Sequence, residues 1–176
     1  MSSRWMAAFM LSPILAMATA IGRAQSSNAH EQCSHKKTPE DAPAAMWTRG
    51  EHAMGFSQTE TAHHFLLKRD GGVIAVSAND AKDSTSRDRI RAHLHHIAEA
   101  FAEGDFDIPM FVHDQEPAGV PVMKRLSREI HYQFRETERG AEVRVASKSP
   151  EAIQAVHDFL VFQIREHKTG DPVSLP

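Results

Sequence analysis

Two strands followed by a helix occur twice along this chain, and this repetition constrains the fold more than any other feature. Residues 64–68 (His-Phe-Leu-Leu-Lys) match 131–135 (His-Tyr-Gln-Phe-Arg) at an offset of 67, and 73–76 match 142–145 at an offset of 69. Glycine-containing turns separate the two strands of each pair, at 70–72 and 138–140. The pattern predicts two β-hairpins whose turns differ in length by two residues.

A helix is expected after each hairpin. In the first, Thr85 is a candidate cap and Gly104 a stop, and in the second Ser149-Pro150-Glu151 is typical of a helix start. Apolar residues recur at helical spacing in both segments. They are Ile90, Leu94, Ile97 and Phe101, then Ile153, Val156, Leu160 and Ile164. We therefore expect an α+β fold of duplicated ββα units, forming a four-stranded antiparallel sheet with two helices on one face.

The expected organisation places this duplicated domain at residues 61–172. The first unit covers 61–104 and the second 128–168. The linker at 105–127 contains three prolines and a glycine, so we expect a loop with one short helical turn near 122–126. In the strands, alternation predicts the residues that point inward. These are Phe65, Leu67, Ile74, Val76, Tyr132, Phe134, Val143 and Val145.

The N-terminus has the pattern of a signal peptide. Arg4 precedes an apolar run from Trp5 to Ala20, and small residues fit cleavage after Ala20 or, as we favour, after Ala24. A membrane anchor is the alternative, but the run is short for a span and contains Pro13. Residues 1–24 thus predict a soluble product that is periplasmic or secreted. Residues 25–60 are expected to be a flexible leader, part of which (42–56) docks on the domain without regular structure.

Composition narrows the function classes. The net charge is −3, which disfavours a nucleic-acid partner, and beyond the signal peptide we expect no membrane contact. A single cysteine, Cys33, excludes an internal disulfide and a CxxC zinc or redox site. No phosphate-binding loop or nucleophile elbow is found in the mature chain. The unusual feature is the presence of 12 histidines.

The histidine excess suggests an exported binding protein for a transition metal ion, a metal-containing cofactor or another small ligand. Without a usable thiolate, imidazole and thioether ligands suit copper, and imidazole alone also suits zinc. His93 and His96 are neighbours at i, i+3, while His64 and His131 occupy matching positions of the two units and could approach each other. The alternative is that helix histidines are solvated and strand histidines hydrogen-bonded. The candidate metal ligands are His63, His64, His93, His96, His113 and His131.

Two other functions remain open. The outer sheet face carries Leu66, Val73 and Ala75, which favours coverage by the leader or by the partner subunit of a homodimer in a structural or interaction domain. Phe159 and Phe162 lie off the core stripe of the second helix and also need a cover. A small enzyme using His157, which falls within that stripe, with His113 or Asp114 is the third interpretation.

Several stretches resemble small exported bacterial proteins of uncharacterised function. They lie at 107–113, 119–121, 157–160 and 166–171, and the resemblance covers most of 54–172. Some such proteins carry an aspartate carbamoyltransferase label. The carbamoyl-phosphate motif of that family is Ser-Thr-Arg-Thr-Arg, and the nearest run here, Ser-Thr-Ser-Arg-Asp-Arg at 84–89, breaks it. The resemblance implies export and a shared domain, and no activity.

Overall fold

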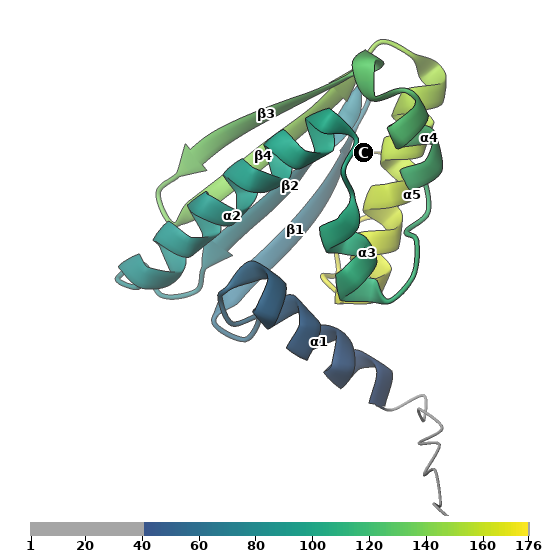
Figure 1. The fold of residues 1–176 in the computed structure, drawn as a ribbon. Coiled ribbons are helices and arrows are strands. Elements are labelled where there is room, and N and C mark those ends of the chain that lie inside the picture. The colour runs from purple at the N-terminus through teal and green to yellow at the C-terminus, as the bar shows by residue number, and fades with distance from the viewer. Residues whose placement is uncertain (1–40, 176) are drawn as a thin grey trace, which may run out of the picture. The chain divides into compact units, whose positions relative to one another are not determined.

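The strands build one antiparallel sheet, as the repeat predicts. A computed structural model describes residues 41–175 of the chain, with side chains from residue 44. The strands are β1 (Thr61–Lys68), β2 (Gly71–Ala78), β3 (Ile130–Thr137) and β4 (Gly140–Ser147), in the spatial order β1-β2-β4-β3 (Figure 1). The expected α+β class is confirmed. The signal peptide, Cys33 and residues 25–40 of the leader lie outside the described residues.

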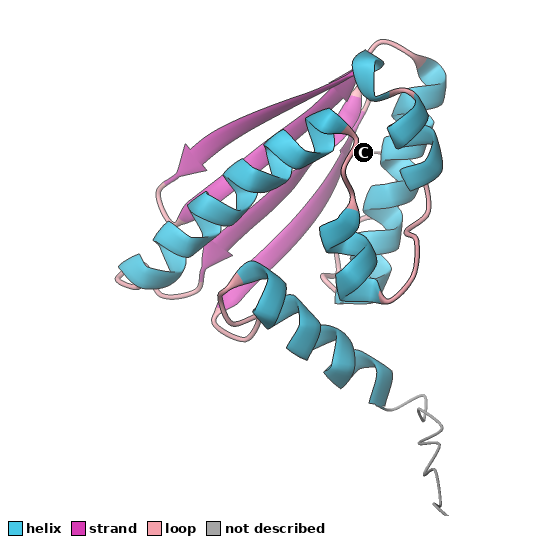
Figure 2. Ribbon diagram, in the orientation of Figure 1, coloured by secondary structure: helices cyan, strands magenta, loops and turns pink. Residues whose placement is uncertain are grey.

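Helices make up the other layer (Figure 2). They are α1 (Asp41–Met54), α2 (Ser84–Glu103), α3 (Asp107–His113), α4 (Val120–Arg125) and α5 (Pro150–His167), with a 3-10 turn at Ser127–Glu129. The long helices α2 and α5 lie on the same face of the sheet, as expected (Figure 1). Within residues 41–175, no helix combines the length and apolar character needed to cross a membrane.

Each long helix packs on the hairpin of the other unit. The contacts of α2 are mainly with β3 and β4, whereas α5 packs on β1 and β2 (Figure 1). The two ββα units are therefore interleaved, and neither hairpin buries its inner face with its own helix alone. The sequence repeat predicts the duplication of elements but not this exchange of partners.

The positions of the strands correct one of the two offsets predicted for the repeat. Both hairpins turn through two residues, and both first strands and second strands are displaced by 69 positions, from Thr61 to Ile130 and from Gly71 to Gly140. The expected offset of 67 for the first strand pair is wrong, because Phe65 corresponds to Phe134. These two phenylalanines end the same cross-strand row, which runs through Ile74 and Val143.

The core lies between this inner sheet face and the helices. All eight side chains expected to point inward belong to it, with Tyr132 and Phe134 packed at its margin. Three aromatic rings extend it toward α5, since Phe101 stacks on Phe106 at 4.3 Å and both contact Phe159. Phe159 is thus covered by Phe106 of the chain's own 105–127 segment.

The linker at 105–127 is more helical than expected. Besides α4, which falls close to the predicted turn, it forms α3. Pro109 and Pro121 lie in the first turns of these helices, where a backbone N–H has no intrahelical partner to lose. The prolines that suggested a loop therefore mark helix starts. At α2, the cap is Asp83 rather than Thr85, because its carboxylate accepts from Ser86 N at 2.9 Å.

The leader also contains a helix where none was expected. Met46, Gly50 and Met54 are spaced at i, i+4 and i+8 on α1, and the first two are buried. Arg49 Nε donates to the carbonyl oxygens of Phe111 and Val112 at 3.0 and 2.9 Å. Since these are the last carbonyls of α3, the arginine ties α1 to the C-terminal end of α3.

No described helix covers the outer face of the sheet. The apolar side chains at the centre of this face expose little surface, because Val73 is only 8% exposed and Leu66 is half-buried. Arg144, the cross-strand neighbour of Val73, helps to shield this face, since its guanidinium donates to Gly72 O and pairs with Asp70. The use of this face by a partner subunit stays a prediction.

Candidate functional site

Four histidines from four different elements line one partly open hollow inside the fold, the internal cavity. It has a volume of about 70 Å³ and lies between the sheet, α2, α3 and α5. The histidines are His63 of β1, His93 of α2, His113 of α3 and His167 of α5. Apart from these and Gln163 the wall is apolar, including the thioether of Met54.

Local structure explains why these side chains face inward. His63 precedes Phe65 by two positions on β1, so both point to the helical face. His93 lies one turn after the buried Ile90 and next to the buried Leu94, at the margin of the apolar stripe of α2. His113 and His167 are the last residues of α3 and α5, which brings two helix ends together at the cavity.

The rings form a continuous series of contacts. The imidazole of His63 stacks on that of His167 with centroids 5.7 Å apart and planes inclined by 13°. His167 in turn meets His113 edge-on, at 5.2 Å and 89°. On the other side Phe56 contacts both His63, at 6.0 Å, and His93, at 5.7 Å. Phe56 thus links the four histidine rings that line the cavity into one series of ring contacts.

Burial keeps these imidazoles neutral. Burial, together with the smaller effect of neighbouring histidines, lowers the pKa of His63 and of His93 to about 4 and that of His167 to about 3. Burial also lowers the pKa of His113, although Gln163 and Glu166 oppose this effect. At neutral pH the cavity thus presents uncharged rings that can each offer a lone pair.

Several polar atoms at the cavity have no protein partner. His113 Nε2 donates to Gln163 Oε1 at 2.9 Å, which places the ring proton on Nε2 and leaves a lone pair on Nδ1. That Nδ1 is buried without a hydrogen-bond partner, and Glu166 Oε2 lies 4.0 Å from it. Two further atoms, His63 Nε2 and Gln163 Nε2, are also buried and unpaired. Because such atoms are costly to leave unsatisfied, they mark the cavity as a place for a ligand.

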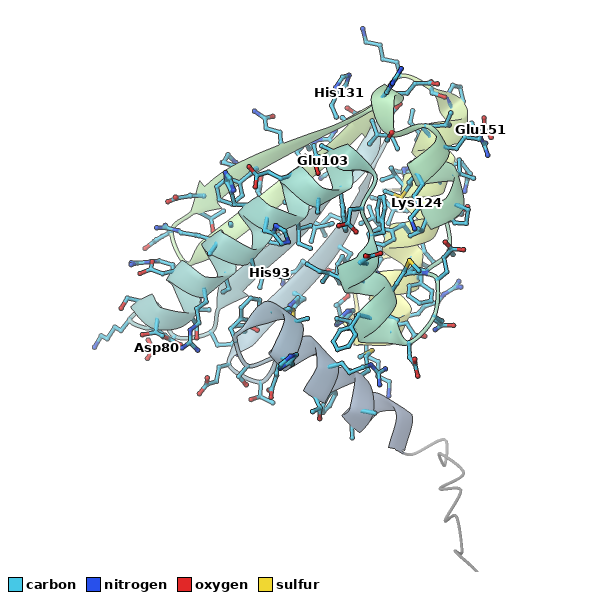
Figure 3. All side chains as sticks on the ribbon, in the orientation of Figure 1. Asp80, His93, Glu103, Lys124, His131 and Glu151 are labelled. Atoms are coloured by element: carbon cyan, nitrogen blue, oxygen red, sulfur yellow. The ribbon has the colours of Figure 1, made fainter. Side chains whose placement is uncertain are left out.

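The structure brings together only three of the six candidate ligands. His64 points to the other side of β1, where Nδ1 lies 2.9 Å from Asp171 Oδ1. His96 is exposed, so His93 alone of that helical pair reaches the cavity. His131 lies on β3, far from His93 (Figure 3). The suggested approach of His64 to His131 is not realised, because β2 and β4 lie between their strands.

Three other residues of the site were missed by sequence reasoning. His167, Gln163 and Met54 all line the cavity. A signal for the first two existed, since Gln163 and His167 are spaced at i, i+4 beside the apolar stripe of α5. What the sequence did not show is that the ends of α3 and α5 meet.

His157, the proposed catalytic residue of the third interpretation, has a structural partner. Its Nε2 donates to Lys68 O at 2.8 Å, at the end of β1. His113, one of the two expected partners of His157 beside Asp114, is bonded to Gln163. This hydrogen bond ties α5 to the end of β1.

The described part of the chain contains no group of three or more His, Cys, Asp or Glu side chains already placed to hold a metal ion. Fold and site together define an α+β domain with a histidine-lined internal cavity. No protein family, curated protein or solved structure matches this chain. What the cavity binds therefore has to be inferred from its own chemistry.

Proposed function

We propose that this protein is an exported binding protein whose ligand is a transition metal ion, held by the histidines of the internal cavity. One observation carries the proposal: four neutral imidazoles line a single hollow, with Met54 also among its lining residues. Export is inferred from the signal-peptide pattern of residues 1–24.

Neutral imidazole is the form that binds metals. A histidine with an ordinary pKa has to lose a proton when it ligates an ion in weakly acidic solution. The low pKa values of His63, His93 and His167 remove that competition down to about pH 5. Burial thus prepares the rings for a metal ion, at the cost of leaving polar atoms unpaired until the ion binds.

His113 has the surroundings that a metal ligand commonly has. Metal-bound histidines usually donate their other ring N–H to a fixed acceptor, which sets the tautomer and the ring orientation. Gln163 Oε1 is such an acceptor for Nε2, and Nδ1 carries the lone pair. Glu166, 4.0 Å from Nδ1, adds a negative charge beside the place that a cation would take.

The donor set favours copper over zinc. Thioether sulfur is a soft ligand that suits copper(I), and imidazole binds copper in either oxidation state. Zinc sites more often combine imidazole with thiolate or carboxylate. Among the described residues that line this cavity, Met54 carries a thioether and none is a cysteine.

Binding requires the rings to turn. Two imidazoles on one ion have centroids about 5 Å apart, since each nitrogen lies about 2 Å from the metal. The separations of 5.7 Å for His63–His167 and 5.2 Å for His113–His167 are close to this value. The stacked planes of His63 and His167, however, do not aim their nitrogens at a common point. Rotation of the rings about their side-chain bonds is therefore part of the proposal.

Metal titration of the purified protein tests it. We expect about one equivalent of copper(I), measured by competition with a chromogenic chelator, and weaker uptake of copper(II) or zinc. His63→Phe and His167→Phe keep a ring in place and should each weaken copper binding at least ~10-fold. His96→Phe and His131→Phe are matched controls at exposed positions. Absence of stoichiometric uptake, or equal losses in all four variants, would refute the proposal.

A small uncharged organic molecule is the second candidate. It is favoured by the apolar character of most of the wall, which is typical of organic-ligand pockets, and by the unpaired Gln163 amide nitrogen. If the protein takes up no metal but phenol raises its melting temperature, and His167→Phe abolishes that rise, the second candidate replaces the first.

A further inference from the structure

A second and larger hollow lies at the edge of β1, outside the internal cavity. This groove has a volume of about 280 Å³. His63 and His167 line both hollows, so their stacked rings form part of the wall between them. The remaining walls come from α1, from the segment that enters β1, and from the chain beyond α5, including Trp47, Gln58, Thr61 and Thr169.

The groove is polar without being charged. No lysine, arginine, aspartate or glutamate is among the residues that line it, whereas three threonines and a glutamine are. The hydroxyl of Thr61 already donates to Ser57 O at 2.8 Å, and that of Thr169 donates to Asp171 Oδ2 at 2.7 Å. Because their protons are committed, both hydroxyl oxygens can act only as acceptors, and that of Thr169 already accepts from Asp171 N at 3.4 Å, with one lone pair remaining.

Two buried polar atoms in the groove wall have no protein partner. They are Nε2 of Gln58 and Nε2 of His63. The Gln58 amide lies against α1, since a Cβ added at Gly50 would lie only 2.2 Å from its Nε2. A buried donor left unpaired is satisfied most economically by a ligand or a water molecule.

Trp47 adds a flat apolar surface at the same place. It is 46% exposed, which is unusual for the largest apolar side chain, and it lies on the α1 side of the groove. An exposed indole beside hydrogen-bonding side chains is the combination that binds amphipathic rings.

We propose that this groove is a binding site for a small uncharged ring that carries hydroxyl groups, such as a monosaccharide. One apolar face of the ring packs on Trp47, and its hydroxyls donate to Thr61 and Thr169 and accept from Gln58. The volume of the groove fits one such ring, being slightly below that of pockets for drug-sized ligands. This site is separate from the metal site of the proposed function, because Trp47, Gln58 and Thr169 line the groove alone.

Saturation-transfer NMR on the full protein tests the proposal, with glucose, galactose, mannose and inositol as probes and gluconate as a charged comparison. We expect saturable transfer to at least one neutral probe and none to gluconate. Trp47→Leu should weaken that binding about 10-fold, since the ring loses its aromatic platform. Phe111→Leu is the matched control, because Phe111 is 50% exposed on α3 and does not line the groove.

Each result has a definite meaning. Absence of transfer to all four neutral probes overturns the proposal, as does unchanged binding in Trp47→Leu or equal weakening in Phe111→Leu. Copper binding should be retained in Trp47→Leu, because Trp47 does not line the internal cavity. Failure of the groove and failure of the metal site are therefore distinguished in the same variant.

Discussion

The imidazole rings of His63 and His167 stack at 5.7 Å, although one residue lies near the start of β1 and the other ends α5. The pair is inclined by only 13°, and both rings line the internal cavity as well as the outer groove. Protonation of either ring would place a positive charge in a buried position beside another imidazole. The stability of the domain is thus linked to the neutral state of its histidines.

The free energy of unfolding should fall as the solution is acidified below neutral pH. Unfolded histidines gain a proton near pH 6.5, whereas folded His63 and His93 gain it near pH 4 and His167 near pH 3. Their contribution is fully present above pH 6.5 and is lost toward the folded pKa values, with a slope of at most about 1.4 kcal/mol per pH unit for each.

Urea denaturation between pH 7 and pH 5 measures this slope, because few carboxylates titrate in that range. His167→Phe should reduce the slope of the free energy of unfolding against pH by the contribution of one histidine. The exposed position His96 provides the control, since His96→Phe should leave the slope unchanged. A free energy of unfolding that is constant from pH 7 to pH 5 would contradict the linkage.

Gly119 should tolerate no side chain. Its φ is +83°, and a Cβ there would lie 2.1 Å from Ala155 O, where the start of α4 meets α5. Gly119→Ala should lower the free energy of unfolding by more than ~3 kcal/mol, since backbone strain and a backbone clash add. Gly170→Ala is the matched control, with φ +77° and nothing within 4 Å, and should cost only about 1 kcal/mol. If chemical denaturation gives the same loss of unfolding free energy for Gly119→Ala and Gly170→Ala, the close approach of Gly119 to Ala155 is unimportant.

Asp171 should hold the C-terminal segment on the edge of the sheet. Its carboxylate accepts from Phe65 N and from Thr169 Oγ1, and also pairs with His64. Partial burial opposes ionisation, yet hydrogen bonds from these groups keep the pKa of Asp171 below its ordinary value. Asp171→Asn should cost about 1–2 kcal/mol and speed hydrogen exchange at the Phe65 amide.

Asp158→Asn is the comparison for that experiment. Asp158 accepts an exposed hydrogen bond from Gln154 on the same helix, so Asp158→Asn should lower the free energy of unfolding by less than ~0.5 kcal/mol. Unchanged exchange at Phe65 in Asp171→Asn would contradict the predicted clamp.

Arg49 should be the main tether of α1. Replacement by Met removes both hydrogen bonds to the last carbonyls of α3 while keeping an apolar stem of similar length. We expect faster proteolysis and faster hydrogen exchange within α1 and little change in the strands. Arg87→Met is the control, because Arg87 pairs only with the exposed Asp88. Protection of α1 that is the same in both variants would rule out this tether.

Local patterns in the sequence were sufficient for the sheet and the long helices. Alternation placed Phe65 and Ile74 on the inner face, Gly104 ends α2 in the left-handed conformation, and Pro150 begins α5. The errors in the predicted secondary structure came from residues that are typical of more than one kind of structure. Pro109 and Pro121 read as loop residues, yet each lies in the first turn of a helix. The helical spacing of Met46, Gly50 and Met54 was present but too short to stand out.

The candidate site was only partly predictable. The composition pointed to histidines, and three of the six chosen ones, His63, His93 and His113, line the cavity. The repeat predicted that His64 and His131 approach each other. Their distance depends on the order of the strands in the sheet, which local sequence does not encode. His167 was passed over because its neighbours in space come from other elements.

The sequence by itself determined the four strands, the two long helices, their order and the inner face of each strand, because these depend on side-chain periodicity and on residues with restricted backbone angles. Only the tertiary structure decided that α2 and α5 exchange hairpins and that the ends of α3 and α5 meet. The four histidines lie together for that reason, and their pKa values are low for the same reason. Burial and contact between distant segments are properties of packing, and local patterns carry no information about which buried surfaces pair.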